Sequence, residues 1–161
     1  MQNRTIQAES DPAPLKGPVT FSARTAYGLV ALLELAGVHS RGGVLRRGEI
    51  AARQGIPERY LEPMLAALRR AGILHSRRGP RGGYQLALPP ADSTVADVVS
   101  CLEGVGRGER RDDPPTAEHS VVAGLEAALE RRRTELLAGR TLAQLLEERE
   151  LLQAAPVMFF I

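Results

Sequence analysis

The sequence contains little of what stabilises secreted domains or builds metal sites. Its 161 residues include a single cysteine, Cys101, and a single lysine. One thiol forms no disulfide within the chain and cannot alone complete a four-ligand metal site. No apolar run approaches the roughly 18 residues of a membrane span, and the N-terminus carries no signal-peptide pattern. We therefore expect a cytoplasmic protein in a reducing compartment, without contact to a membrane.

What is present is an uneven distribution of charge. Residues 20–90 hold eleven arginines and four glutamates and carry a net charge of +7, whereas residues 91–161 hold eight arginines and thirteen acidic residues and carry −5. An arginine-rich genome explains the preference for arginine over lysine but not the lack of acidic residues in one half. The basic segment is therefore predicted to face a polyanion. Residues 1–19 are neutral, contain three prolines and show no periodicity, which indicates a flexible N-terminal arm.

The basic segment has the pattern of a helix-turn-helix. A first helix is predicted from the N-cap residue Ser22 to Gly37, with an apolar face formed by Ala26, Leu29, Val30, Leu33 and Ala36. A short helix over 48–54 ends in a turn at Gly55, and Pro57 suits the first turn of the helix that follows. In that helix, residues at helical spacing are expected to be buried: Tyr60, Leu61, Met64, Leu65 and Leu68. Two short helices joined by a glycine turn are typical of DNA-binding proteins.

A hairpin rich in arginine and glycine follows the helix-turn-helix. Residues 73–77 and 84–88 are predicted strands, and the connection between them surrounds Arg77, Arg78 and Arg81 with small residues. Such a wing suits phosphate contact or the insertion of an arginine into a narrow minor groove. A nucleotide-binding P-loop is the rival interpretation of these glycines, but its pattern of glycine, four residues, glycine, lysine and serine or threonine is absent.

The acidic half is predicted to be helical. A helix over 94–104 places Val95, Val98, Val99 and Leu102 inward, with Cys101 next to that face as a buried, inert thiol. A long amphipathic helix ends at Gly139, and its apolar positions are Val121, Val122, Leu125, Leu129, Leu136 and Leu137. Thr141 caps a shorter helix carrying Leu142, Leu145 and Leu146. A long helix that follows a finished small domain needs a partner surface, for which a second copy of the chain is favoured over the domain's own flank.

The predicted fold is therefore mainly α, with a winged helix-turn-helix domain, a small two- or three-stranded wing and a long C-terminal dimerisation helix. We expect the N-terminal arm over 1–19, the DNA-binding domain over 20–103, a polar loop over 104–116, and the dimerisation helix with a C-terminal helix over 117–161.

Four segments carry a resemblance to a known family: FSARTAYGLVALLELA, EIAARQGIPERYLEPMLAALRRAGIL, SRRGPRGGYQLALPPADSTVADVVSCLEG and GRTLAQLLE. Together they resemble the Rrf2 family of bacterial transcription regulators, over about residues 21–146. The resemblance implies a homodimer that binds a pseudo-palindromic operator in double-stranded DNA.

The resemblance also assigns the candidate DNA-binding residues. It implies backbone contacts from Arg24 and Tyr27 in the first helix, although a solvated Arg24 and a core Tyr27 remain open. It places Arg59, Tyr60 and Glu62 in the recognition helix and Arg78, Arg81 and Gly82 in the wing, beside Arg77. Glu62 is the favoured discriminator between bases, because a carboxylate accepts from a cytosine amino group. Its alternative role is that of a solvated helix charge.

The chain departs from the family at the iron–sulfur site. Many members hold a cluster with three cysteines in the region that here reads Gly104–Glu118, and this region has none. Cys101 and His119 are the remaining weak candidate ligands, with Asp112, Asp113 and Glu118 as accessory groups. We therefore expect no cofactor and a protein or small-molecule effector. An iron–sulfur sensor with atypical ligands is the alternative.

Two other classes of function compete with DNA binding. One is an interaction module, in which the winged helix docks on another protein. The other is an enzyme, which is disfavoured because His39, His75 and His119 are scattered and no nucleophile, base and acid set is evident.

Overall fold

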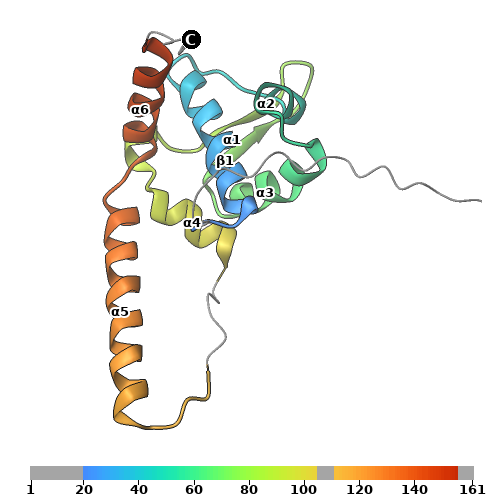
Figure 1. Cartoon of the computed structure of the whole chain (residues 1–161). Helices are drawn as coiled ribbons and strands as arrows, with labels where there is room; N and C mark the ends of the chain where they lie inside the picture. Colours follow the sequence, from blue (N-terminus) through green and yellow to red (C-terminus); the bar gives the residue numbers. More distant parts are fainter. Residues whose placement is uncertain (1–19, 105–110, 156–161) are drawn as a thin grey trace, which may run out of the picture.

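The computed structural model describes residues 20–104 and 111–155, which form a mainly helical fold with one two-stranded antiparallel sheet (Figure 1). The elements in chain order are α1 (Ala23–His39), α2 (Arg47–Gln54), α3 (Glu58–Arg70), β1 (Leu74–Arg77), β2 (Gly83–Leu86), a short 3-10 turn (Pro90–Asp92), α4 (Val95–Glu103), α5 (Ala117–Ala138) and α6 (Leu142–Ala154). Within these two ranges, no helix is both long and apolar enough to cross a membrane. The predicted arm over 1–19, residues 105–110 of the predicted loop and residues 156–161 lie outside the described residues.

Helix α1 is the centre of the core. It packs against α3, α4, α6 and β2, and its Ala31, Leu32 and Leu35 are fully buried. The predicted apolar face was wrong in phase, since only Leu29 and Ala36 of its five members are buried. The reason is that almost every position of this helix is apolar, so that the periodicity does not define a face. The buried face is instead set by the elements that surround the helix.

The predicted start of α1 is confirmed, whereas its predicted end is wrong. The side chain of Ser22 accepts a hydrogen bond from the backbone N–H of Thr25 at 3.2 Å, as its predicted N-cap role requires. The helix does not end at Gly37 but continues to His39. A Cβ atom at Gly37 would lie 2.8 Å from the guanidinium nitrogens of Arg149 in α6, so the end of the arginine side chain would have to shift.

The helix-turn-helix is formed by α2 and α3, which are joined at Gly55 in the left-handed conformation (φ 63°). Pro57 is the N-cap residue of α3 and not its first helical residue. Four members of the predicted apolar stripe are buried, but the prediction for Tyr60 was wrong, because this residue is 41% exposed. Tyr60 lies at the edge of the stripe, whose centre falls on Leu61 and Leu68, and so the core does not cover it.

The wing is a short hairpin that is anchored on the core. Strands β1 and β2 pair in register from Leu74 opposite Leu86 to Arg77 opposite Gly83, and both leucines are buried. Leu45, just before α2, adds a third chain segment through two backbone hydrogen bonds with Tyr84, of 2.8 and 3.0 Å. The predicted mainly α fold with a small wing is confirmed, and the wing is joined to the start of the helix-turn-helix.

Helix α5 runs away from the rest of the fold, and only its C-terminal part contacts α4 (Figure 1). All four predicted inward residues of α4 are buried. Two backbone hydrogen bonds fasten the start of α4 to the α5–α6 junction: Val95 N–H to the Arg140 carbonyl at 2.8 Å, and Leu142 N–H to the Ser93 carbonyl at 2.9 Å. A hydrogen-bonded ion pair of 3.0 Å between Arg133 and Glu103 adds a side-chain link between α5 and α4.

Candidate nucleic-acid interface

The turn of the wing depends on two glycines. The backbone N–H of Gly82 donates to the Gly79 carbonyl at 2.9 Å, and a Cβ atom at Gly82 would lie 2.3 Å from the Arg77 carbonyl oxygen. A Cβ atom at Gly83 would lie 2.6 Å from the carbonyl oxygen of Leu45. Both distances are far below van der Waals contact. Gly82, predicted as a DNA contact, therefore has a structural reason to be glycine, and its contact with DNA stays a prediction.

The arginines of the wing are exposed. Arg77 lies at the end of β1, and Arg78 and Arg81 lie in the turn that follows. The guanidinium group of Arg46 donates to the carbonyl of Pro80 in this turn, which links the wing tip to the beginning of α2. The backbone N–H of Arg46 donates in turn to the carboxylate of Glu49, and so closes the first turn of α2. The wing and the helix-turn-helix are thus held together at the start of β2 and in the turn that precedes it.

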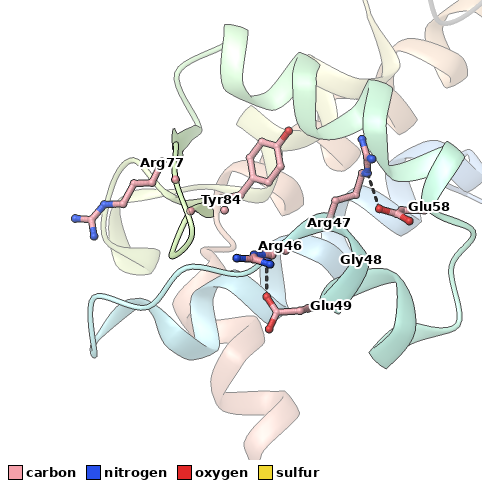
Figure 2. A pocket seen from close by; sticks show the side chains of 10 residues that line it. Arg46, Arg47, Gly48, Glu49, Glu58, Arg77 and Tyr84 are labelled. Atoms are coloured by element: carbon pink, nitrogen blue, oxygen red, sulfur yellow. Dashed lines mark hydrogen bonds and ion pairs between the residues drawn. The ribbon is translucent and has the colours of Figure 1, made fainter.

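An open hollow of about 590 Å³ lies between the wing and the helix-turn-helix. Figure 2 shows Arg46, Arg47 and Tyr84 around it, with Arg77 pointing away from them. Its lining comes from the start of α2, the start of α3 and the wing: Arg46, Arg47, Gly48, Glu49, Glu58, Arg77, Gly79, Gly82, Gly83 and Tyr84. Three arginines against two glutamates leave the hollow weakly positive. Arg78 and Arg81 add positive charge in the adjoining turn.

The three candidate residues of the recognition helix α3 are all exposed. The guanidinium of Arg59 lies 5.1 Å from the centre of the Tyr60 ring, a cation–π distance that orients both side chains. Glu62 is 67% exposed, and one of its carboxylate oxygens lies 3.2 Å from a terminal nitrogen of Arg47 in α2. Glu62 is therefore available to a ligand from solvent, but it is not a solitary helix charge.

Arg47 also pairs with Glu58, whose carboxylate accepts from its Nε at 2.9 Å. This hydrogen bond, with the charge of Glu62 added to it, raises the pKa of the Arg47 guanidinium above its ordinary value. The pair of carboxylates thus stabilises the charged form of Arg47.

Arg24 and Tyr27 lie apart from this hollow. Arg24 is exposed in the first turn of α1, whereas Tyr27 is half-buried and packs against the hydrophobic core. Neither residue lines the hollow between α2, α3 and the wing. The two interpretations of Tyr27, core residue and phosphate contact, are compatible, because a half-buried tyrosine keeps a polar end at the surface. The contacts of Arg24 and Tyr27 with DNA stay predictions.

Sequence reasoning missed Arg46 and Arg47 as residues of the candidate interface. A signal for them was present in the sequence. Two adjacent arginines precede Glu49 at the start of a helix, where the helix dipole disfavours positive charge. Such a placement indicates that each arginine has an anionic or carbonyl partner outside its own helix. The structure provides these partners in Glu58, Glu62 and the Pro80 carbonyl.

The candidate cluster ligands do not form a site within one chain. Cys101 is half-buried, and burial raises the pKa of its thiol, although the charges of Arg24 and Arg70 offset part of that rise. Its neighbour Glu103 pairs with Arg133, which lies fourteen residues beyond His119 on α5. At 1.5 Å per residue, His119 lies about 21 Å along α5 from Arg133, the residue through which α5 pairs with the end of α4. His119 is therefore far from Cys101.

His119 lies instead 3.8 Å from Asp113, beside a hollow of about 390 Å³ that Arg111, Glu118 and Val122 also line. In the part of the chain that the structure describes, no three histidine, cysteine or acidic side chains are grouped as metal ligands. One thiol and scattered carboxylates do not fit an iron–sulfur cluster, which several cysteine thiolates hold.

Comparisons with known proteins are consistent across sequence and structure. Residues 21–148 match the Rrf2 family, which is described as an iron-dependent transcriptional regulator. The chain is 30% identical over 138 residues to the HTH-type transcriptional regulator IscR of Photorhabdus laumondii, a match that covers 84% of each protein. Among solved structures, T. potens IscR gives a TM-score of 0.71 at 33% identity, covering 86% of this chain and 93% of that one. CymR (YrzC), the global cysteine regulator of B. subtilis, gives 0.66 at 30% identity, covering 81% and 98%.

Proposed function

This chain belongs to the Rrf2 family of transcriptional regulators, which are not enzymes, and from that membership we propose that it binds an operator in double-stranded DNA as a homodimer. The observation that carries the proposal is the joining of the recognition helix, the start of α2 and the arginine wing along one hollow. The wing is exposed, and its arginines lie on a narrow turn. The net charge of +7 over residues 20–90 supports a polyanionic ligand.

Recognition is divided between two elements in this proposal. Helix α3 enters the major groove, where Arg59, Tyr60 and Glu62 face the bases. The wing follows the backbone, where Arg77, Arg78 and Arg81 contact phosphates or enter the adjacent minor groove. Affinity then comes mainly from the wing, and sequence preference comes mainly from α3.

The second copy of the chain binds along α5 in this proposal. Five apolar side chains of α5 are between 50% and 74% exposed: Val121, Val122, Leu125, Leu129 and Leu136. A stripe of this size on a helix that leaves its own domain supports a partner surface. Two copies that pair along α5 present two recognition helices, which suits a pseudo-palindromic operator with half-sites about 34 Å, or a multiple of it, apart.

Control of binding is proposed to work without the family's usual iron–sulfur cluster. The single, half-buried Cys101 and the distance of His119 from it support this proposal. A protein partner or a small molecule then supplies the signal. The cytoplasm is the proposed location, because that is where a bacterial regulator meets DNA. The test is anaerobic purification followed by iron analysis and a visible spectrum, and stoichiometric iron with visible absorbance would refute the cluster-free proposal.

DNA binding is tested by selecting an operator from a pool of random duplexes at low salt. Arg81→Ala is expected to weaken binding to all sequences and to reduce the slope of log affinity against log salt by about one. Glu62→Ala is expected to change which sequences are selected. Arg53→Ala is the matched control, because Arg53 lies in the last turn of α2, does not line the hollow and pairs with Glu34 of α1 at 3.1 Å. Failure of the parent protein to select any duplex would refute the proposal and favour an interaction module.

Dimerisation is tested separately by placing charges on α5. The substitutions Leu125→Glu and Leu129→Glu are expected to convert the dimer into a folded monomer, since both side chains are more than 60% exposed in the single chain. Sedimentation velocity measures the change, and circular dichroism checks that the helices persist. A parent protein that sediments as a monomer at micromolar concentration would refute this part of the proposal.

A further inference from the structure

Arg47 joins the two helices of the helix-turn-helix through two acidic side chains. Its Nε lies 2.9 Å from Oε1 of Glu58, and its Nη1 lies 3.2 Å from Oε1 of Glu62. Glu58 and Glu62 are four residues apart, so they occupy neighbouring positions on one face of α3. One guanidinium group from α2 thus spans two carboxylates of the recognition helix.

The two contacts that Arg47 makes with these acids differ in strength. Glu58 makes the shorter contact, and its hydrogen bond is the main influence on the Arg47 guanidinium. Glu58 therefore anchors Arg47, and Arg47 in turn holds Glu62, the more exposed of the two acids at 67% against 51%. Only one oxygen of Glu62 is occupied by this pairing. The other oxygen remains an acceptor that can reach a ligand.

From this geometry we propose that Arg47 is a positioning residue, which fixes the carboxylate of Glu62 so that its second oxygen reads a base edge. The inference rests on the proposed DNA-binding function and adds a determinant of specificity to it. A glutamate on an exposed helix surface otherwise occupies several rotamers and offers its acceptor in several directions. A carboxylate that is held at one oxygen is preorganised, so its other oxygen offers its acceptor in one direction. Such a fixed acceptor discriminates a cytosine amino group from a base oxygen more sharply than a mobile carboxylate does.

Arg47 is poorly suited to the alternative role of a phosphate contact. Two carboxylates already offset its charge, its Nε donates to Glu58, and its Nη1 lies 3.2 Å from Glu62. Arg78 and Arg81, in contrast, lie exposed in the wing turn. Loss of Arg47 should therefore affect which base is preferred, whereas loss of Arg81 should affect affinity for every sequence.

The experiment compares selected operators and binding isotherms for the full chain and five variants. Arg47→Ala removes the bridge, Arg47→Lys keeps the charge without a second donor nitrogen, and Glu62→Ala removes the reader. The fourth variant combines Arg47→Ala with Glu62→Ala. Arg53→Ala is the control, because Arg53 lies in the last turn of α2 and pairs with Glu34 of α1 at 3.1 Å. Thermal melting checks that each variant is folded.

The expected result is a loss of discrimination that depends on Glu62. A good base contact contributes at least a fivefold preference, so Glu62→Ala should remove a preference of about fivefold or more at one position of each half-site. Arg47→Ala and Arg47→Lys should reduce the same preference at the same position. The double variant should match Glu62→Ala alone, because Arg47 acts through Glu62. Arg53→Ala should keep the parent preference.

Two results would overturn the inference and leave the proposed function intact. The first is an Arg47→Ala variant that keeps the parent preference and loses about one unit of salt slope, which would make Arg47 a phosphate contact. The second is an Arg47→Lys variant with the parent preference, which would show that charge alone is enough. A parent protein that binds no duplex overturns the proposed function itself, and the inference with it.

Discussion

The substitution Gly83→Ala is expected to loosen the wing from the helix-turn-helix. A methyl group at residue 83 would lie 2.6 Å from the Leu45 carbonyl oxygen and 2.8 Å from the Leu45 carbonyl carbon. Ordinary contact begins at 3.4 Å, so the two chain segments have to separate by about 0.8 Å. Leu45 is paired with Tyr84, the next residue along β2, and the separation therefore acts directly on this pair.

The size of the effect follows from the hydrogen bonds that the separation breaks. The two bonds between Leu45 and Tyr84 measure 2.8 and 3.0 Å and would lengthen beyond the usual limit of about 3.2 Å. At about 1 kcal/mol each, their loss lowers the free energy of unfolding by about 2 kcal/mol. For a chain of this length, that corresponds to a fall in Tm of about 4–8 °C.

The assay combines urea unfolding with hydrogen exchange at one protein concentration, because the proposed dimer would make stability depend on concentration. The amides of Leu45 and Tyr84 should lose protection, whereas those in the middle of α1 should keep it. Gly48→Ala in α2 is the matched control, since a methyl group there would make only an ordinary contact with Glu58 at 3.6 Å and should raise stability slightly. A Gly83→Ala protein with unchanged stability and unchanged protection at both amides would refute the reasoning.

Three further changes have defined outcomes. Leu32→Ala should lower the free energy of unfolding by about 2–5 kcal/mol in urea titrations, because Leu32 is fully buried in α1; a loss below about 1 kcal/mol would contradict its place in the core. Thr141→Ala should cost about 1 kcal/mol, since its hydroxyl accepts from the Gln144 N–H at the start of α6; a neutral result would contradict the cap. Alkylation of Cys101 should rise with pH at a higher midpoint in the folded protein than in urea, because burial raises the pKa of the thiol. The folded state then holds its proton to higher pH, so stability should fall as pH rises through that window, and an equal or lower midpoint in the folded protein would contradict the burial.

The sequence was informative where polar and apolar residues alternate clearly. In α4 the four predicted inward residues are all buried, because Asp97, Ser100 and Glu103 recur at every third position and define the opposite, polar side of the helix. In α1 the same method gave the wrong face, since nearly every residue of the helix is apolar. Tyr60 was misplaced because spacing alone includes a residue at the edge of a stripe, and only the packed neighbours decide whether the edge is covered.

The candidate interface was predicted in outline but not in its contacts. The arginine and glycine composition of the wing and the exposed positions of α3 could be identified from the sequence. The bridge from Arg47 to Glu58 and Glu62 could not, because it joins two helices through a turn whose geometry the spacing does not define. The close approach of Leu45 to Gly83, which excludes a side chain at Gly83, could not be predicted either, because the two residues lie far apart along the chain.

The contact between α6 and α1 bears on how the protein is made. Arg149 donates to the carbonyl of Leu33 at 3.1 Å, so an early segment of the chain is completed by a segment 116 residues later. During synthesis, α1 leaves the ribosome long before α6 exists, and one side of the helix stays uncovered for the interval. At roughly 5–20 residues per second, the interval lasts about 6–23 s. The first helix of the core is therefore among the last to be fully packed, and in the growing chain it is a natural binding site for chaperones.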